Sequence, residues 1–420
     1  MTQKRWVSPS VTELAEPAAP APIAMPDSHH TAPASPLRLT LAEATRARNA
    51  WIEVDLDALA HNLAALRAAI GPGCEMIVVV KGNAYGAGIE GVAPALEAAG
   101  VERFAVAWVS EGVQLRELGV RRPILVLGHA FPEDAGAALA HDLTITCHSL
   151  ALGRAMSAAA VRTGKTARIH IHIDSGLHRD GVSLEEGVAL AGELRGLPGV
   201  EVEGISTHMA NADEPDDSFS DAQAALFRDA TERLPGIPYR HTANSATALR
   251  RAGLRFEGVR IGLALHGVLP SNTPGPALRP ILSIKARLAR VSTVAAGEGV
   301  SYGLTWRANR ESRAALVPVG YADGWSRHLG NRGEVLIGGR RCPMVGRVMM
   351  DRFVADVTDV TGAAEGDEAV LLGSQAGERI TADEVAAAAA TIPWDTFAAL
   401  TGRLPRIFHR QGVVERITGG

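Results

Sequence analysis

The stretch "IVVVKGNAYGAG", residues 77–88, joins four β-branched residues to a lysine and a glycine-rich turn. A continuous run of Ile and Val is typical of a strand that is buried on both faces, as in a parallel sheet. Lysine is seldom buried, so Lys81 either reaches solvent at the strand end or is needed there for its chemistry. The chain has only four lysines among its 42 basic residues, and an amine, unlike a guanidinium, can lose its proton and act as a nucleophile.

The sequence on either side of this stretch alternates short apolar runs with helical segments. Before it, residues 55–70 place leucines and an isoleucine at helical spacing, and Gly71 follows as a stop signal. This alternation over about 230 residues predicts parallel strands in a closed (β/α)8 TIM-like barrel. An open doubly wound sheet is the alternative, but no GxGxxG motif follows the first strand. The further runs that we expect to be strands are residues 103–109, 123–128, 143–147, 167–174, 202–207 and 239–245.

The pattern changes near residue 281. From there on, short strands are separated by glycine turns, and one Ala-rich segment, residues 381–392, is helical in character. This predicts a mainly antiparallel β-domain over residues 281–420, after a barrel over residues 48–280. Residues 1–47 are rich in Ala, Pro and small polar residues and cannot bury enough apolar area to form a core, so we expect a disordered tail.

Composition and charge exclude several classes of partner. The 420 residues carry a formal net charge of −4 with both signs interspersed, which argues against a nucleic-acid or anionic-membrane partner. No apolar run approaches the roughly 20 residues of a membrane span, and the N-terminus lacks the apolar stretch of a secretory signal. The three cysteines are widely spaced and form neither a disulfide framework nor a zinc pattern. We therefore expect a cytoplasmic protein with a small-molecule ligand.

Polar residues that could carry chemistry fall at predicted strand ends. In a barrel the active site lies at the C-terminal ends of the strands, where the sequence places Lys81, Asp174, His208 and Ser245. A lysine that is desolvated there has a lowered pKa, and its neutral amine can form a Schiff base with an aldehyde. A lysine that simply reaches solvent fits the strand context equally well.

The segment "IHIHID", residues 169–174, supports a rival interpretation. Alternation puts His170, His172 and Asp174 on one face of a strand, and His178 lies close by in the sequence. A His-x-His pair at a barrel strand end is how some barrel hydrolases hold a metal ion. Other ligand-rich strand ends are lacking, so we predict no metal site. Zinc analysis of the purified protein would separate a metal-dependent hydrolase from the Schiff-base interpretation.

The segment around Lys81 resembles the lysine segment of alanine racemases, whose pattern is close to K-A-N-A-Y-G-H-G. The resemblance extends from about residue 50 to the C-terminus and keeps the family's segment order. It implies a barrel that carries pyridoxal 5'-phosphate (PLP), a β-rich C-terminal domain, a head-to-tail homodimer and a role in supplying D-alanine for peptidoglycan. The other segments that carry the resemblance are "NAWIEVDLDALAHNLAALR", "FAVAWVSEGVQLRELG", "IDSGLHRDGV", "GISTHMANADE", "HTANSATAL", "GVRIGLALHG", "GEGVSYGLTW", "VGYADGWSR" and "VGRVMMDRF".

The resemblance implies a role for each of eight residues at the cofactor. Lys81 would hold PLP as a Schiff base, His208 would lie against its ring, and Arg260 would face the pyridine nitrogen. Because arginine keeps its proton, that nitrogen would stay unprotonated and the ring would be a weaker electron sink, which favours racemisation over transamination. Arg179 would pair with the phenolic oxygen and with the substrate carboxylate. The cofactor phosphate would be bound by Tyr85, Ser245 and backbone amides near Gly262 and Leu263.

The resemblance also implies a second catalytic residue. Racemisation needs an acid and a base on opposite faces of the α-carbon, so Lys81 alone is not enough. The family pattern supplies Tyr302, in "VSYGLTW", from the β-domain of the partner subunit. Tyr321 would constrict the substrate entrance, and Met350 and Asp351 would lie beside the substrate carboxylate, the methionine through its backbone amide. Without the resemblance, these tyrosines would be assigned to core or interface packing.

Two positions depart from the family pattern. Many alanine racemases carry a carbamylated lysine that braces the arginine, and this chain has His172 there. Histidine forms no stable carbamate, so Arg179 needs another partner, such as an anion or another carboxylate, and the substrate range is in doubt. Trp394 stands where the family usually has a tyrosine whose hydroxyl reaches the phosphate. Loss of that hydrogen bond would cost roughly 1.5–3 kcal/mol and weaken PLP affinity.

The sequence thus predicts a PLP-dependent racemase that interconverts L- and D-alanine. A racemase of serine, or of a broader range of amino acids, on the same scaffold is the nearest alternative. A PLP-dependent decarboxylase of basic amino acids is more remote, because such enzymes lack the S-Y-G tyrosine and the R-x-G-x-A-L segment. A non-catalytic PLP-binding protein is also remote, because small relatives of that type lack the β-domain.

Overall fold

The computed structural model describes residues 40–46 and 48–419. The prediction of a disordered tail over residues 1–47 therefore falls largely outside the described residues. Its last part does not, because helix α1 spans Leu41–Arg46. Ala44 of this helix is buried in a cluster with a tryptophan of the first strand, and this packing stabilises a short helix that its own sequence would not.

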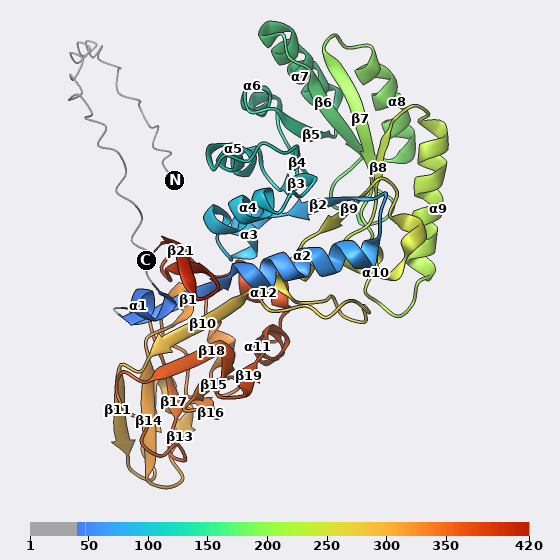
Figure 1. The fold of residues 1–420 in the computed structure, drawn as a ribbon. Helices are drawn as coiled ribbons and strands as arrows, with labels where there is room; N and C mark the ends of the chain where they lie inside the picture. Colours follow the sequence, from blue (N-terminus) through green and yellow to red (C-terminus); the bar gives the residue numbers. More distant parts are fainter. Residues whose placement is uncertain (1–39, 47, 420) are drawn as a thin grey trace, which may run out of the picture. The chain divides into compact units, whose positions relative to one another are not determined.

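The first sheet confirms the predicted barrel class (Figure 1). Its eight strands are parallel, and its two end strands are linked by isolated backbone hydrogen bonds. The N–H of Arg260 donates to the C=O of Ala243 at 2.8 Å, and the N–H of Glu257 donates to the C=O of Arg240 at 3.2 Å. These bonds bring the ends together into a near-closed barrel. The strand order is β8 (Tyr239–His241), β7 (Val200–Ser206), β6 (Ala167–His172), β5 (Leu143–Cys147), β4 (Ile124–Val126), β3 (Arg103–Val106), β2 (Glu75–Val79) and β9 (Gly258–Ile261).

Helix α2 (Leu56–Ile70) shows how local sequence signals set the helices around the barrel. Asp55 caps its first turn, because one carboxylate oxygen accepts the backbone N–H groups of Asp57 and Ala58, both at 2.9 Å. Gly71 ends the helix with a φ of 85°, a conformation that glycine adopts readily. The leucines and the isoleucine that were predicted to share one face are all buried.

Further helices surround the barrel strands (Figure 1). The helices around the barrel are α4 (Ile89–Ala98), α5 (Val109–Glu117), α6 (Ala135–Ala140), α7 (Leu150–Thr163), α8 (Leu184–Arg195), α9 (Ser218–Arg233) and α10 (Ser245–Arg250). No helix in the described part of the chain is long and apolar enough to cross a membrane.

The second sheet confirms the predicted antiparallel region. All of its neighbouring strands are antiparallel except β1 and β20, and the predicted Ala-rich helix is α11 (Ala382–Ala389), followed by α12 (Pro393–Ala398). A separate pair, β12 (Gly299–Val300) and β13 (Trp306–Arg307), lies outside this sheet. The strand order is β11 (Arg290–Val294), β14 (Ser312–Val317), β17 (Phe353–Asp356), β16 (Arg340–Val345), β15 (Glu334–Ile337), β18 (Glu368–Gln375), β10 (Leu282–Arg287), β1 (Ala50–Asp55), β20 (Arg406–Arg410) and β21 (Val413–Thr418), with β19 (Glu378–Ile380) beside β18.

Strand β1 differs from the predicted domain boundaries. The sequence assigned residues 48–280 to the barrel, but β1 pairs with β10 and β20 of the second sheet, and Figure 1 shows the blue β1 beside the yellow-orange β10. Trp51 and Ile52 are buried there, and Glu53 pairs with Lys285 of β10 at 3.1 Å. An apolar strand carries no local signal for which sheet it joins, so its partners could not be read from the sequence.

A buried arginine holds the turn after Lys81 against the C-terminal part of the chain. Arg406 of β20 donates from Nε and Nη2 to the C=O of Gly86, at 3.0 and 2.8 Å. Gly86 has a φ of 76°, and a Cβ there would overlap the backbone carbonyl of Phe397 in α12. Only glycine permits this close approach, so the packing of α12 fixes the turn that carries the lysine.

Candidate active site

Residues Lys81–Tyr85, labelled α3, form a short left-handed turn one residue after the end of β2. The four residues after the lysine have φ of 62°, 56°, 51° and 51°. Such a backbone costs about 1–2 kcal/mol for each non-glycine residue, and strain of this kind clusters at functional sites. The turn is held by side chains: Asn83 accepts the N–H of Ile89 at 2.8 Å, and Glu111 accepts the N–H of Gly82 at 2.7 Å.

A cavity of about 830 Å³ lies beside this lysine, at the C-terminal ends of the barrel strands. Its volume is that of a typical cofactor or small-ligand site. It brings together every residue that the resemblance assigned to the cofactor, although they are spread over most of the barrel sequence. We call these residues the cavity group: Lys81, Tyr85, Arg179, His208, Ser245, Arg260, Gly262 and Leu263.

The surroundings of Lys81 favour its neutral amine. Burial lowers the pKa of Lys81 below the ordinary 10.5, and the positive charges of Arg179 and Arg260 act in the same direction. Glu111 opposes them only in part. The side chain is therefore closer to its nucleophilic form than a lysine on the surface would be.

The guanidinium of Arg260 is buried and held on two of its three nitrogens. Nη1 donates to Nδ1 and the C=O of His241 at 2.6 and 3.0 Å. The two N–H groups of Nη2 are shared among three acceptors, the C=O groups of Thr207 and Thr242, both at 2.8 Å, and Nδ1 of His208 at 3.0 Å. Burial lowers the pKa of Arg260 to about 10, which leaves it charged near neutral pH. Nε makes no hydrogen bond with any described residue, so its N–H is the donor that remains for a ligand.

Tyr85, Ser245 and Gly262 converge on one part of the cavity wall. The N–H of Gly262 lies 3.3 Å from Oγ of Ser245, and a Cβ at Gly262 would overlap the hydroxyl of Tyr85. Burial raises the pKa of Tyr85 to about 12, so the phenol keeps its proton and can donate it in a hydrogen bond. Two hydroxyl groups and a backbone amide at one place are suited to an anion.

Arg179 pairs with a residue that the sequence analysis missed. Its Nε lies 3.0 Å from Oδ2 of Asp180, and the side chain of Arg179 is about half exposed. No hydrogen bond joins His172 to Arg179 among the described residues, and Nδ1 of His172 bonds Oγ of Ser206 at 2.9 Å instead. Burial, with the charge of Arg260, lowers the pKa of His172 to about 3, so this histidine is neutral and supplies no negative charge. The "RD" dipeptide was the available signal, but adjacent opposite charges are common on surfaces.

Four other predicted site residues do not line the cavity of their own chain. Tyr302 and Tyr321 are 69% and 42% exposed, and Met350 is 53% exposed. Asp351 is exposed as well and pairs with Arg403 at 2.7 Å. We call Tyr302, Tyr321, Met350 and Asp351 the exposed group.

The segments that carry the exposed group contact one another. Tyr321 lies in the 3-10 turn η5 (Tyr321–Asp323), and its N–H donates to the C=O of Met349 at 3.1 Å. Next to Tyr302, Oγ of Ser301 donates to the C=O of Arg347 at 2.6 Å. The segments of the four residues are therefore connected through residues 347–351.

The cavity mouth contains aromatic and apolar residues that were not all predicted. Trp394 of α12 lines the cavity, and its indole N–H makes no hydrogen bond with any described residue. Ile392 and Trp108 line it too and are more than half exposed. These residues come from two segments nearly 300 positions apart in the sequence, so only the fold places them together.

Two histidines of the metal interpretation, His170 and His172, have partners outside it, whereas His178 pairs with Asp174 at 3.1 Å. His170 bonds His241 and Glu203, and Oδ1 of Asp174 accepts three backbone N–H groups of the loop that follows β6. Within residues 40–46 and 48–419, no group of three or more His, Cys, Asp or Glu side chains has the arrangement to hold a metal ion.

Two family models match the chain: alanine racemase, N-terminal domain, over residues 54–270 and alanine racemase, C-terminal domain, over residues 281–408. The chain belongs to the alanine racemase family. An alanine racemase from Geobacter sulfurreducens is 41% identical over 374 residues, which cover 87% of this chain and 98% of that protein. Members of the alanine racemase family bind PLP.

Solved alanine racemases share the fold described above. The enzyme from Bacillus anthracis with bound L-Ala-P superposes with a TM-score of 0.83 at 37% identity, covering 89% of this chain and 98% of that one. The enzyme from Bartonella henselae with covalently bound pyridoxal phosphate gives 0.78 at 27% identity, covering 86% and 99%. The barrel and the second sheet are thus both alanine racemase features.

Proposed function

We propose that this protein is a PLP-dependent alanine racemase that interconverts L- and D-alanine and supplies D-alanine for peptidoglycan in the cytoplasm. The observation that carries the proposal is Lys81, a partly buried amine with a lowered pKa, in one cavity with the remaining donor of Arg260. The family membership of the chain indicates the reaction class, and the cavity contains the residues that would bind the cofactor and the substrate.

The cavity group fits PLP at each of its functional groups. The amine of Lys81 would bind the aldehyde, and the Nε–H of Arg260 would donate to the ring nitrogen and keep it unprotonated. Tyr85, Ser245 and Gly262 would bind the phosphate, as their convergence on one part of the wall suggests. Bound PLP would supply a ring that delocalises the electrons released when the α-proton leaves.

The other cavity residues would orient the substrate. Arg179 would hold the substrate carboxylate, while Asp180 keeps its guanidinium near the mouth. His208 would lie against the cofactor ring, where its bond to Arg260 fixes its position. Lys81 would then move a proton at the α-carbon from one face only, because a single amine cannot reach both faces.

The second face needs a group from outside the chain's own cavity. We infer a head-to-tail homodimer in which Tyr302 of the partner subunit reaches the cavity mouth and moves the other proton. The partner subunit would also bring Tyr321 to the entrance and Met350 and Asp351 to the substrate carboxylate. The high exposure of these residues supports this inference, since a tyrosine and a methionine gain most from being covered.

Serine or a larger amino acid is the alternative substrate. Two observations favour a broader range: Arg179 has Asp180 as its partner instead of a carbamylated lysine, and Trp394 changes the shape of the cavity mouth. Arg179, Asp180 and Trp394 all line the cavity in which the substrate would bind.

The test is α-proton exchange in D₂O. Purified protein with added PLP would be incubated with a panel of L- and D-amino acids, and deuterium uptake and chirality would be followed together. We expect fast exchange with inversion for alanine and none with Lys81→Ala. Preference for serine or a basic amino acid would keep the mechanism and change the substrate. No exchange with any of them, despite a bound yellow cofactor, would contradict the proposal.

A further inference from the structure

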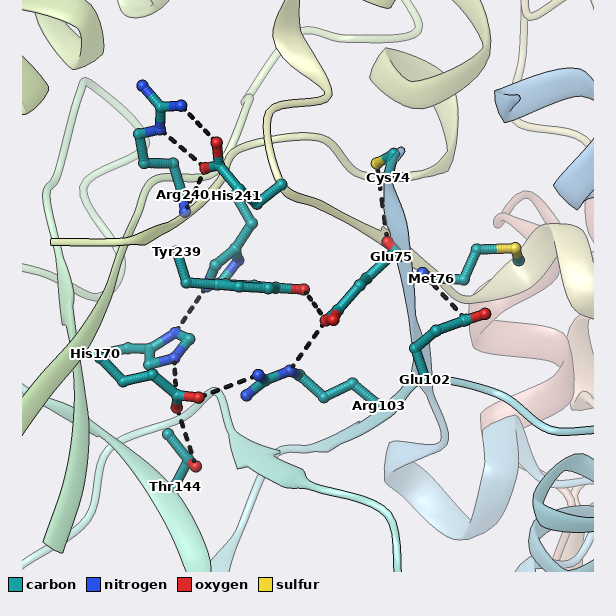
Figure 2. Close-up of polar contacts among 12 residues, drawn as sticks. Cys74, Glu75, Met76, Glu102, Arg103, Thr144, His170, Tyr239, Arg240 and His241 are labelled. Atoms are coloured by element: carbon teal, nitrogen blue, oxygen red, sulfur yellow. Dashed lines mark hydrogen bonds and ion pairs between the residues drawn. The ribbon is translucent and has the colours of Figure 1, made fainter. Parts of the chain in front are cut away.

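A line of polar side chains runs through the barrel interior, from Arg260 beside the cavity toward the N-terminal ends of the strands. The line consists of Arg260, His241, His170 and Glu203. Figure 2 shows His241 and His170 pointing toward each other, with Tyr239, Arg103 and Glu75 beside the line. The two imidazoles are almost completely buried. His241 lines the cavity, but His170 and Glu203 do not, so these two can act on a ligand there only through His241 and Arg260.

The proton positions along this line follow from Arg260, which can only donate hydrogen bonds. Nδ1 of His241 must accept from it, at 2.6 Å, so the proton of a neutral His241 is on Nε2. That proton faces Nδ1 of His170 at 2.9 Å, which must accept in turn. The proton of His170 is therefore on Nε2, and it faces a carboxylate oxygen of Glu203 at 3.2 Å.

Both imidazoles must be neutral for this pattern to hold. Burial lowers the pKa of His170, and burial together with the charge of Arg260 lowers the pKa of His241 far below its ordinary value. Each ring then carries one proton, and every N–H along the line points away from Arg260 and toward Glu203.

Glu203 ends the line as a carboxylate that is itself held in place. Arg103 donates to its Oε1 at 3.0 Å, and the hydroxyl of Thr144 lies 3.5 Å from its Oε2. Burial acts in the opposite direction, but the hydrogen bonds from His170 and Arg103 hold the pKa of Glu203 at about 2. The fixed negative charge of Glu203 polarises the two imidazoles. Nδ1 of His241 is then a stronger hydrogen-bond acceptor for Arg260.

Loss of this carboxylate would leave the proton of His170 without its acceptor. If that proton moved to Nδ1, the tautomer of His241 would have to reverse as well. An N–H of His241 would then face an N–H of Arg260, and the guanidinium would have to turn away. The Nε–H of Arg260, which the other contacts of this guanidinium direct into the cavity, would then point elsewhere.

We propose that Glu203 and His170 are positioning residues that fix His241 as an acceptor and so aim the Nε–H of Arg260 into the cavity. This inference deepens the proposed function, on which it rests for the identity of the ligand. Glu203 and His170, which do not line the cavity, would thus help to determine how the cofactor ring is held.

The first test needs no cofactor. In apoprotein with ¹⁵N-labelled histidine, the ring nitrogens of His241, assigned by comparison with His241→Gln, report which nitrogen carries the proton. We expect a protonated Nε2 and a bare Nδ1 in the wild type, and a mixture of tautomers in Glu203→Met. Glu203→Gln, whose amide oxygen still accepts from His170, is expected to keep the wild-type tautomer.

The second readout is the bound cofactor itself. We expect Glu203→Met to weaken PLP binding by about tenfold and to shift the visible absorption band, with a smaller change in Glu203→Gln. Tyr239→Phe is the matched control: it removes a 2.8 Å hydrogen bond to Glu75 in the same core but leaves the line intact, so neither readout should change. If Glu203→Met does not fold, His170→Phe breaks the same line and is expected to show the same changes.

A bare Nε2 on wild-type His241, or an unchanged tautomer and PLP affinity in the folded line-breaking variant, would overturn the inference. Equal changes in Tyr239→Phe would overturn it too, because they would reflect general disturbance of the core. The expected tautomers in a wild-type protein that fails to bind PLP would instead contradict the proposed function and leave the positioning of Arg260 standing.

Discussion

The cavity group and the exposed group differ in how much of their environment one chain supplies. Arg260 has hydrogen bonds on two of its three nitrogens, and Lys81 stands on a strained turn that α12 and Arg406 hold in place. In contrast, Tyr302 is 69% exposed, and its neighbours fix its backbone but not its ring. In the racemase proposed above, the fold would therefore complete one face of the reaction centre within a single chain and leave the residues for the other face on the surface.

The two groups differ in whether their side chains must be held in a fixed environment before two subunits associate. A lysine that must be neutral needs a dry and structured surrounding, which only a barrel interior provides. A tyrosine that acts on the opposite face must approach from outside, so it belongs on a surface that is covered later.

Lys81→Ala should have the largest effect. Without the amine, PLP cannot be held covalently and one base is lost, so we expect no visible Schiff-base band and a fall in racemisation of at least about 10⁴-fold. Absorbance and chirality measurements check this. Lys165→Ala is the control, because Lys165 pairs with Asp142 outside the cavity and should leave both readouts unchanged. A normal band in Lys81→Ala would contradict the assignment.

Tyr302→Phe should have a large but one-sided effect. The phenol acts on one face only, so exchange of the α-proton should slow by about 10²–10⁴-fold from one enantiomer and far less from the other. Deuterium uptake from L- and D-alanine, measured separately, gives the two rates. Equal slowing from both enantiomers would count against the two-base assignment and against the contrast between the two groups.

Some elements of the fold and of the candidate site could be predicted from the sequence, and others could not. Helix α2 was predictable because Asp55, the leucine spacing and Gly71 are local signals. The sheet that β1 joins was not, since an apolar strand does not encode its partner. The line from Arg260 to Glu203 was not either, because hydrogen-bonded neighbours along it lie up to 71 positions apart in the sequence. His170 was instead assigned to a metal interpretation, since the pattern shows which residues share a strand face but not what they face.

Trp394→Tyr should have a moderate effect on the cavity group alone. A phenol at the cavity mouth could regain the phosphate hydrogen bond, and we expect PLP to bind about tenfold more tightly. Titration of apoprotein with PLP gives the affinity. Trp394→Phe adds no donor and should not improve binding. Equal gains in both variants would show that the size of the ring, and not the hydroxyl, sets the affinity.

Acid should destabilise the barrel interior through its buried histidines. Burial lowers the pKa of His266 to about 4 and is the main cause that lowers that of His172 to about 3. Between these values and about 6.5 the unfolded chain binds protons that the folded chain does not, so the free energy of unfolding falls as the pH falls. The slope is about 1.4 kcal/mol per pH unit for each histidine.

Urea unfolding of the apoprotein at several pH values between 7.5 and 4.5 measures this slope. His172→Gln should reduce it, whereas His328→Gln, at an exposed position near the exposed group, should not. An equal slope in both variants would show that the buried histidines do not cause the acid sensitivity.

Subunit complementation tests the central claim most directly. Lys81→Ala and Tyr302→Phe chains, each nearly inactive, would be mixed in equal amounts, unfolded and refolded together, and assayed for racemisation. In a mixed homodimer one cavity has both Lys81 and the Tyr302 of the partner subunit, so activity should return to about one quarter of wild type. No gain over the two parents, with mixed dimers shown to form by differently tagged chains, would contradict the shared site.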